Sequence, residues 1–140
     1  MENIFAVLPT PTAESGPFWE ACNRGDLLLQ KCDGCGHVFY YPRQMCPQCG
    51  KREPGWITST GRGTVYSYSH IAVSFYGAQW ESQIPYTVIL VDLDEGPRML
   101  SRLIGDDRDR AKIGDRLEVI FVEVEKQKLP FFRIAAVKPA

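Results

Sequence analysis

The 140-residue sequence contains no hydrophobic run that approaches the ~20 residues needed to cross a bilayer. It also lacks an excess of positive charge, since its formal net charge at pH 7 is −1. Nucleic-acid-binding proteins normally carry a basic excess, because Lys and Arg contacts to phosphates supply most of their non-specific affinity. We therefore expect no membrane segment, and nucleic-acid binding is disfavoured.

Histidine is scarce: the sequence has only His37 and His70. Neither stands at a spacing from a nucleophilic residue that suggests a nucleophile–base pair. We expect His37 to be a surface residue beside a cysteine turn and His70 to be a partly hydrogen-bonded strand residue. The chain is therefore predicted to hold no catalytic residues. Residues 1–13 also lack the charged and then apolar pattern of a secretory signal, so we expect a cytoplasmic protein with reduced cysteines.

Four of the five cysteines form two Cys-x-x-Cys pairs that stand ten residues apart, at Cys32, Cys35, Cys46 and Cys49. Two residues between thiolates allow one tight turn to present both sulfurs to a tetrahedral ion at about 2.3 Å. Neighbouring glycines allow the backbone to turn back with positive φ. Four thiolates leave no position for water or substrate, so the pattern predicts a structural Zn²⁺ site.

Disulfides and a redox dithiol are the alternatives for these cysteines. Disulfides are typical of secreted proteins, and a thioredoxin-type motif has one such pair, which opens a helix after a strand. Neither pattern matches two pairs that flank a short hairpin at about residues 38–41. The remaining Cys22 is expected to be a small buried residue on a helix.

The first quarter of the chain predicts an irregular arm over residues 1–12 and then a short helix. Ser15 and Gly16 can cap the helix, a proline suits its first turn, and Gly25 is expected just past its end. Phe18 and Trp19 share its apolar side with Cys22. A helix this short must dock on the core or on another subunit.

The second half has the two-residue period of β-strands. Strands are expected at residues 64–71, 86–93, 98–104, 117–125 and 131–137, with a turn at 94–96 and a charged connector at 105–114, which includes one helical turn. In the first strand, Tyr66, Tyr68 and His70 are expected on one face and Val65, Ser67, Ser69 and Ile71 on the other. Five strands favour a small closed OB-fold barrel over an immunoglobulin-like sandwich, which has about seven.

The predicted fold is mostly β. It divides into an N-terminal arm and helix (1–26), a rubredoxin-like zinc ribbon that contains a short strand at 27–31 (27–57), and an OB-fold barrel (58–140). A long first loop in the barrel, residues 73–85, carries Phe75, Tyr76 and Trp80. We expect no regular structure in it. These aromatic residues either serve a ligand or an interface, or cover the end of the barrel as core.

Seven segments together resemble a known family, the rubredoxin-like zinc-ribbon plus OB-fold proteins, long classed as a domain of unknown function. They are FWE (18–20), LLQKCDGCG (28–36), PR (42–43), CPQCG (46–50), GRGTVYSY (61–68), PY (85–86) and VDLDEG (91–96). The similarity extends over about residues 18–132. The arm and the loop at 73–85 match no family pattern.

The resemblance implies a non-catalytic, acyl-CoA-associated accessory subunit that docks on a thiolase-like enzyme in a hetero-oligomer. In this family the partner performs acyl transfer, condensation or retro-aldol cleavage of a CoA ester, including steroid side chains, and a MaoC-type hydratase is sometimes a further partner. The small subunit helps to bind or channel the CoA moiety. The implied ligands are structural Zn²⁺ and acyl-CoA.

Coenzyme A phosphates favour arginine forks, and adenine favours an aromatic plane. The candidate contacts to CoA or to a partner are Phe18, Trp19, Arg62, Tyr66, Phe75, Tyr76, Trp80 and Arg102. For each arginine the alternative is a solvated surface charge, which is the commoner fate of an arginine. The alternative function is a single-stranded nucleic-acid-binding OB-fold protein with Tyr66 and Tyr68 as stacking platforms, and a free-standing enzyme is a third.

Overall fold

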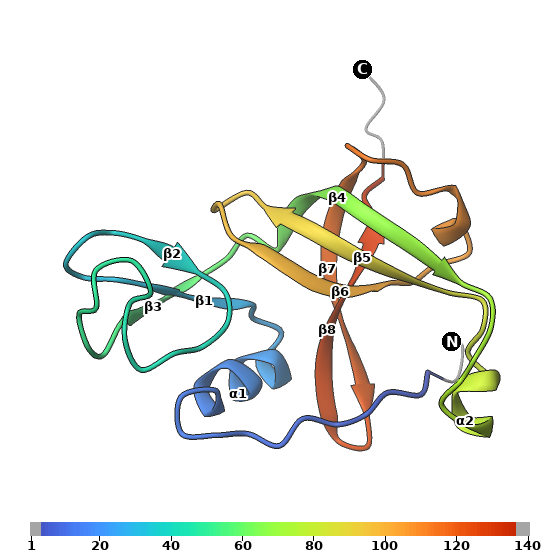
Figure 1. The fold of residues 1–140 in the computed structure, drawn as a ribbon, viewed down its shortest axis with the longest axis horizontal. Helices are drawn as coiled ribbons and strands as arrows, with labels where there is room; N and C mark the ends of the chain where they lie inside the picture. Colours follow the sequence, from blue (N-terminus) through green and yellow to red (C-terminus); the bar gives the residue numbers. More distant parts are fainter. Residues whose placement is uncertain (1–3, 137–140) are drawn as a thin grey trace.

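Two β-structures follow one another along the chain, with a helix packed at their junction (Figure 1). The computed structural model describes residues 4–136. A three-stranded sheet holds the cysteines, and a closed five-stranded barrel forms the second half. The predicted fold class, mostly β with an N-terminal helix, a ribbon and an OB-type barrel, is confirmed.

Helix α1 (Gly16–Arg24) begins and ends where the sequence predicts. Gly25 has a φ of 85°, and its N–H and that of Asp26 bond to the carbonyls of Cys22 and Ala21 at 3.0 and 2.9 Å. Only the Ser15 side chain departs from expectation, because it makes no capping bond to the helix and accepts the Thr12 N–H instead. The helix packs against strands β1 (Leu28–Lys31) and β8 (Gln127–Ile134).

The ribbon is a small antiparallel sheet in the order β2-β1-β3, formed by β1 (Leu28–Lys31), β2 (Val38–Phe39) and β3 (Gly55–Thr58). The hairpin expected at about residues 38–41, between the cysteine pairs, is not formed there, because β2 pairs back with β1 and the resulting hairpin encloses the first cysteine turn. The buried Gln30 side chain bonds both the N–H and the carbonyl of Arg43, at 2.7 and 2.9 Å. This amide therefore fixes the segment that leads to the second cysteine turn.

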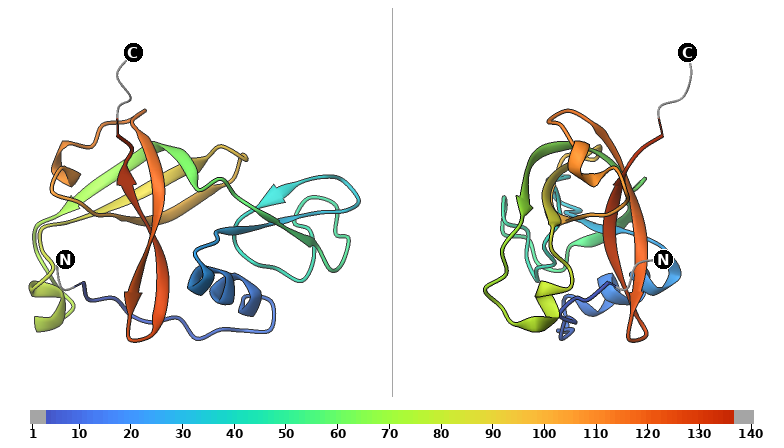
Figure 2. Two further views of the ribbon diagram at one scale, coloured as in Figure 1. Left: turned by 180° about the vertical axis from the view of Figure 1, so that it is seen from behind. Right: turned by 90° about the vertical axis from the view of Figure 1, so that its right-hand side faces the viewer.

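The barrel closes in the order β4-β5-β6-β8-β7. Its strands are β4 (Arg62–Ile71), β5 (Tyr86–Leu93), β6 (Arg98–Leu103), β7 (Arg116–Val124) and β8 (Gln127–Ile134). A parallel pairing of β6 with β8, at Leu103 and Phe132, closes it. Figure 2 shows the barrel from two further sides.

The last strand was predicted four residues too late, at 131, and its predicted end, Val137, lies outside the described residues. The strand includes Pro130, a residue that cannot donate to a ladder. This proline lies within β8, opposite Phe121, because β8 pairs with β6 only at Phe132 and so needs no N–H at Pro130 on that side. Its carbonyl accepts the Ser101 hydroxyl at 2.8 Å.

The GRG segment at the start of β4 is explained by packing. A Cβ at Gly61 would clash with the Val119 side chain, and one at Gly63 would lie 2.6 Å from the Asp92 carbonyl oxygen. These glycines let β4 approach β7 and β5 closely enough to pair with both.

One hydrophobic core spans the helix, the ribbon strand β1 and the barrel. Phe18 and Cys22 from α1 and Leu29 from β1 belong to the same cluster as Val91 and Phe132 from the barrel. Residues 105–114 contain the expected helical turn, η1 (Arg108–Arg110). The loop at 73–85 also contains a short helix, α2 (Ala78–Glu81), so the expectation of no regular structure there was wrong.

Candidate functional site

The four ribbon cysteines converge on one point between their two turns. Their Sγ atoms all lie within 4.8 Å of one another. Cys32 Sγ lies 3.5 Å from Cys49 Sγ, and Cys35 Sγ lies 3.7 Å from Cys46 Sγ. Four sulfurs at about 2.3 Å from a tetrahedral ion would stand ~3.8 Å apart. The donor set therefore fits zinc, and all five cysteines are free thiols without disulfides.

The two cysteine turns share one backbone design. The N–H of Gly36 bonds to the Cys32 carbonyl and the N–H of Gly50 to the Cys46 carbonyl, both at 2.9 Å. Both glycines have positive φ, 77° and 81°. The turns therefore curl back as the glycine spacing predicted, and each aims its two sulfurs inward.

Backbone amides also point at the sulfurs. The N–H groups of Cys35 and Gly34 donate to Cys32 Sγ at 3.5 and 3.3 Å, and Gln48 N–H donates to Cys46 Sγ at 3.4 Å. The Cys35 amide is the leading cause that lowers the pKa of the Cys32 thiol to about 6. A thiolate is the form that binds metal, so these amides prepare the ligand.

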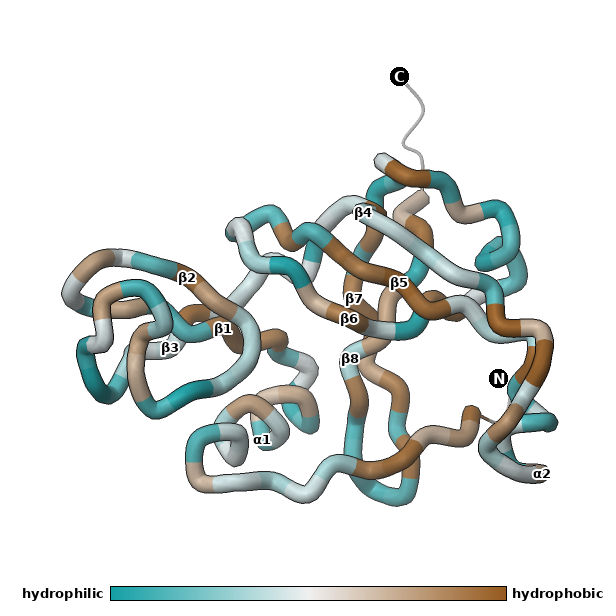
Figure 3. The backbone as a smooth tube through the Cα atoms, in the orientation of Figure 1, coloured by the Kyte–Doolittle hydropathy of each residue, from teal (hydrophilic) through white to brown (hydrophobic). Residues whose placement is uncertain are grey.

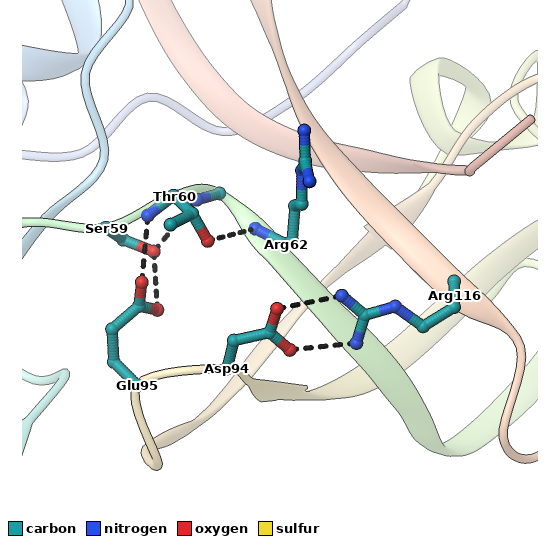
Figure 4. A network of polar contacts seen from close by, with 7 residues as sticks. Ser59, Thr60, Arg62, Asp94, Glu95 and Arg116 are labelled. Atoms are coloured by element: carbon teal, nitrogen blue, oxygen red, sulfur yellow. Dashed lines mark hydrogen bonds and ion pairs between the residues drawn. The ribbon is translucent and has the colours of Figure 1, made fainter.

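A polar network that sequence analysis missed ties the linker after β3 to the turn between β5 and β6 (Figure 4). Glu95 accepts the Ser59 hydroxyl at 2.7 Å and the Thr60 N–H at 2.8 Å. Beside it, Asp94 accepts two bonds from Arg116, both at 2.8 Å, and this guanidinium lowers the pKa of Asp94. Residues 94–96 form the predicted turn, but two of their side chains also connect distant segments.

The aromatic residues of the loop at 73–85 separate into two groups. Phe75 and Tyr76 are 85% and 77% exposed, on the segment before α2. Trp80, in α2, is half-buried against the rings of Phe5 and Tyr86, at centroid distances of 5.1 and 5.5 Å. Trp80 therefore covers this end of the barrel, whereas Phe75 and Tyr76 are available to a partner.

The two candidate arginines differ in their surroundings. Arg102, on β6, donates to the Phe5 carbonyl at 3.3 Å and to Gln83 Oε1 at 3.1 Å, so it holds the N-terminal arm and the loop. Arg62 is exposed at the start of β4, and its side chain points away from Asp94 and Arg116 (Figure 4). Arg62 is the better placed of the two to meet a ligand from solvent.

The tyrosines of β4 do not form one platform. A β-bulge between Val65 and Ser67 makes Tyr66 an extra residue in the pairing with β5. Beyond the bulge, Tyr68 pairs with the buried Ile89, on the same face as Val65, so the predicted grouping of Val65 with Ser67 was wrong. The predicted alternation holds after the bulge, where Tyr68 and His70 share one face.

Two side chains of β4, Tyr66 and His70, contact residues of strands β6 and β5. The Arg98 guanidinium carbon lies 3.3 Å from the centroid of the Tyr66 ring and covers one of its faces. His70 Nδ1 lies 2.8 Å from the Thr87 hydroxyl, as expected for a partly satisfied strand histidine. A base could stack only on the other face of Tyr66.

The aromatic pair of α1 lies at the junction of helix, ribbon and barrel. Phe18 is 2% exposed and packs edge-on against Trp19 and Tyr40, at 4.9 and 5.6 Å. Trp19 is half-buried. Phe18 is therefore a core residue rather than a contact for CoA or a partner. The sequence could not distinguish these roles, because the same spacing of aromatic residues is typical of the buried side of a helix and of an interface.

Comparison with known proteins identifies both halves of the chain. The family model of the ChsH2 rubredoxin-like zinc ribbon domain matches residues 19–55, and that of the ChsH2 C-terminal OB-fold domain matches residues 56–122. A solved structure, the "Ltp2-ChsH2(DUF35) aldolase", superposes with a TM-score of 0.81 at 30% identity, over 92% of this chain and 100% of that chain.

Three curated relatives are similar in sequence. A DUF35 domain-containing scaffold protein of Methanothermobacter thermautotrophicus is 35% identical, over 74% of this chain and 77% of that protein. A probable enoyl-CoA hydratase alpha subunit of Thermomonospora curvata is 32% identical, over 93% of this chain and 41% of that protein. Benzoylsuccinyl-CoA thiolase subunit BbsA of Geobacter metallireducens is 32% identical, over 54% of this chain and 49% of that protein.

The chain thus spans less than half the length of the hydratase and thiolase relatives but most of the scaffold protein. None of the helices among residues 4–136 is long and apolar enough to cross a membrane. The two matched domains, the convergent cysteines and the closed barrel agree: this chain belongs to the DUF35 family, in which a ChsH2-type rubredoxin-like zinc ribbon precedes an OB-fold domain.

Proposed function

We propose that this chain is a non-catalytic accessory subunit that docks on a thiolase-like enzyme and helps to bind or channel its CoA ester. The observation that carries the proposal is the match to the ChsH2(DUF35) chain of an aldolase, which covers that chain completely. The names of the scaffold and thiolase-subunit relatives support the same role.

The chemistry of the side chains supports a non-catalytic role. Four thiolates close the coordination sphere of the metal, so a bound zinc would supply structural stability rather than an open site for substrate. Cys22 is buried, and burial raises the pKa of its thiol to about 12, so it is a poor nucleophile. The reaction is accordingly assigned to the partner.

The contacts to the partner are assigned to the exposed aromatic side chains of the barrel loop. Phe75 and Tyr76 expose large apolar surfaces at neighbouring positions, and aromatic residues are enriched among the side chains that dominate binding energy at interfaces. Arg62 is proposed to meet a CoA phosphate from the start of β4. Trp19 and Tyr66, both part-exposed, are kept as further contact candidates.

The partner's reaction is proposed to be acyl transfer, condensation or retro-aldol cleavage of a CoA ester, with steroid side chains among the substrates. A MaoC-type hydratase is proposed as a further partner, since one relative is named as a hydratase alpha subunit. We place the complex in the cytoplasm, and we keep the division into arm and helix (1–26), ribbon (27–57) and barrel (58–140).

The test is reconstitution with a defined partner. The tagged chain is purified from its native host, and the bound protein is identified by mass spectrometry and then produced recombinantly. We expect a thiolase-like subunit, a stable complex on size-exclusion chromatography, and turnover of a CoA ester only when that subunit is present. Turnover by the isolated chain, or failure of the two folded proteins to associate, would contradict the proposal.

A matched pair of variants tests the loop. Replacing both Phe75 and Tyr76 with Ser is expected to weaken the complex by about tenfold or more, because aromatic hot-spot residues each contribute around 2 kcal/mol. The control is Ile113→Ser, which removes a similarly exposed apolar side chain from the connector before β7. Equal affinity of both variants would remove the loop from the interface.

A further inference from the structure

An apolar groove of about 420 Å³ runs along the barrel beside the N-terminal arm. Its floor is formed by outward-facing residues of the barrel, which include Val88 of β5, Leu100 of β6 and Phe131 of β8. Trp19 of α1 and Trp80 of α2 form two further walls, and Val7 of the arm lines the margin. Segments from four parts of the chain therefore surround one hollow.

Strand β5 shows that this face of the barrel is built to be covered. Its inward residues Ile89 and Val91 are fully buried, and its outward residues Tyr86, Val88 and Leu90 are also apolar or aromatic. Figure 3 shows β5 as a largely hydrophobic strand. A strand with one solvated face normally alternates between apolar and polar residues, whereas a strand covered on both faces does not.

The arm supplies only part of this cover. Residues 4–11 run past the β7–β8 hairpin toward α1 without pairing in any sheet (Figures 1 and 2). The attachment is concentrated at Phe5, whose ring packs on Trp80, whose N–H donates to Gln83 Oε1 at 3.0 Å, and whose carbonyl accepts a bond from Arg102. Within the described part of the arm, residues 4–11, Phe5 is thus the latch of a strap, and Leu100 remains 53% exposed beside it.

Two polar side chains of the lining, Ser101 and Arg102, already have partners within the chain. The Ser101 hydroxyl donates to the Pro130 carbonyl at 2.8 Å, and Arg102 bonds to Phe5 and Gln83. The lining therefore offers mainly hydrocarbon and aromatic surface, with few polar groups to hydrogen-bond a sugar or the edge of a base. Its volume lies within the range of small-molecule sites, about 300–1,000 Å³.

We infer that this groove is a binding site for the hydrocarbon part of a small ligand, with the arm as a strap that closes over it. In the complex proposed above, that ligand is the acyl chain of the CoA ester, and this identification rests on the proposed function. The site itself rests on the lining, the size and the latch.

The three tryptophans allow a direct test, since Trp19 and Trp80 line the groove and Trp56 lies outside it, on β3. In the Trp56→Phe variant, fluorescence reports only the groove. The isolated chain is titrated with octanoyl-CoA, acetyl-CoA and CoA. Buried methylenes each add about two- to fourfold in affinity, so octanoyl-CoA is expected to bind at least tenfold more tightly than acetyl-CoA. Octanoyl-carnitine, which has the same chain without CoA, is expected to compete.

Two variants localise the response. Leu100→Glu places a charge on the groove floor and is expected to lower octanoyl-CoA affinity at least tenfold, whereas Ile113→Glu, at a more exposed apolar residue elsewhere, leaves it unchanged. Equal binding of octanoyl-CoA and acetyl-CoA, or full affinity in Leu100→Glu, overturns the inference. If the inference fails but the thiolase-like complex forms, the proposed function stands without this site. If affinity depends on acyl-chain length but no such complex forms, the groove stands as a hydrocarbon site and the proposed function fails.

Discussion

Glu95 and Ser59 lie 36 positions apart in the sequence, and a 2.7 Å hydrogen bond joins them where the ribbon meets the barrel. The second oxygen of the same carboxylate accepts the Thr60 N–H at 2.8 Å (Figure 4). The Ser59 hydroxyl in turn accepts the N–H of Gly61, at 2.9 Å. One side chain therefore fixes three consecutive residues of the linker, and with them the orientation of the metal-binding sheet relative to the barrel.

Replacing Glu95 with Ala is expected to lower the free energy of unfolding by about 1.5–3 kcal/mol, because hydrogen bonds to a charged acceptor are lost at a part-buried linker. Chemical denaturation measures the loss. Amide hydrogen exchange should also accelerate at Thr60 and Gly61. The control is Glu123→Ala, an exposed residue of β7, which is expected to change stability by less than ~0.5 kcal/mol. Equal stability of the two variants would show that the linker does not depend on this carboxylate.

Removal of the metal should unfold the ribbon. The purified chain is expected to contain one zinc ion per molecule, and a strong chelator should release it with loss of stability, since metal binding to four thiolates is coupled to folding. Atomic absorption and thermal denaturation measure both effects. Cys32→Ser should lose the metal, while Cys22→Ser, outside the cluster, should keep it. Full zinc content in Cys32→Ser would refute the assignment of the ligands.

Thiol reactivity should follow three stages. With metal bound, a disulfide reagent at pH 8 is expected to find almost no reactive thiol. After chelation the four ribbon cysteines should react, and after full denaturation the fifth, Cys22, should follow. The reason for the last stage is that burial raises the pKa of Cys22 to about 12, so its reactive thiolate is very rare at pH 8. Early reaction of Cys22 would mean that α1 opens readily.

The raised pKa of Cys22 also predicts how the stability of the fold changes at alkaline pH. Cys22 keeps its proton in the folded state up to about pH 12, whereas the unfolded thiol loses it near its ordinary pKa of about 9. The unfolded state therefore binds fewer protons between these values, and stability should fall as pH rises through that window. A Cys22→Ala variant should lose less stability than the parent between pH 9 and 11, measured by urea denaturation. An identical pH dependence of stability in the parent and in Cys22→Ala would show that the Cys22 thiol is not held protonated by burial.

Gly63→Ala should destabilise the barrel by about 1–3 kcal/mol, because the added methyl would lie 2.6 Å from the Asp92 carbonyl oxygen and force β4 away from β5. Gly16→Ala is the matched control, since nothing lies within 4 Å of a Cβ there and the residue opens α1. Its stability should be unchanged or higher. Thermal unfolding compares the two, and similar melting temperatures would indicate that the strands can separate without cost.

Local patterns predicted the features that depend on neighbouring residues. The cysteine spacing located the metal site, Gly25 marked the end of α1, and the run of apolar residues in the middle of β5 placed that strand with its observed bounds. These signals act within one turn or one strand. They require no knowledge of what lies on the other side of the molecule.

Features that depend on distant residues were not predictable in this way. The bulge at Tyr66 is set by the pairing of β4 with β5, and it reverses the faces of the later residues relative to Val65. Whether Pro130 can lie within a strand depends on whether a neighbouring strand needs an N–H there, and β6 does not. Glu95 and Phe5 find their partners 35 and 78 positions away, and no local pattern announces either contact.

The shared interior of helix, ribbon strand and barrel limits how the protein can be taken apart. The two family models meet between residues 55 and 56, yet Phe18, Cys22 and Leu29 are buried together with Val91 and Phe132. Cutting the chain at that point would expose hydrophobic core surface on both fragments, and each fragment should aggregate. Gene fusions, domain exchanges between relatives and crystallisation trials should therefore keep the helix, the ribbon and the barrel together in one polypeptide.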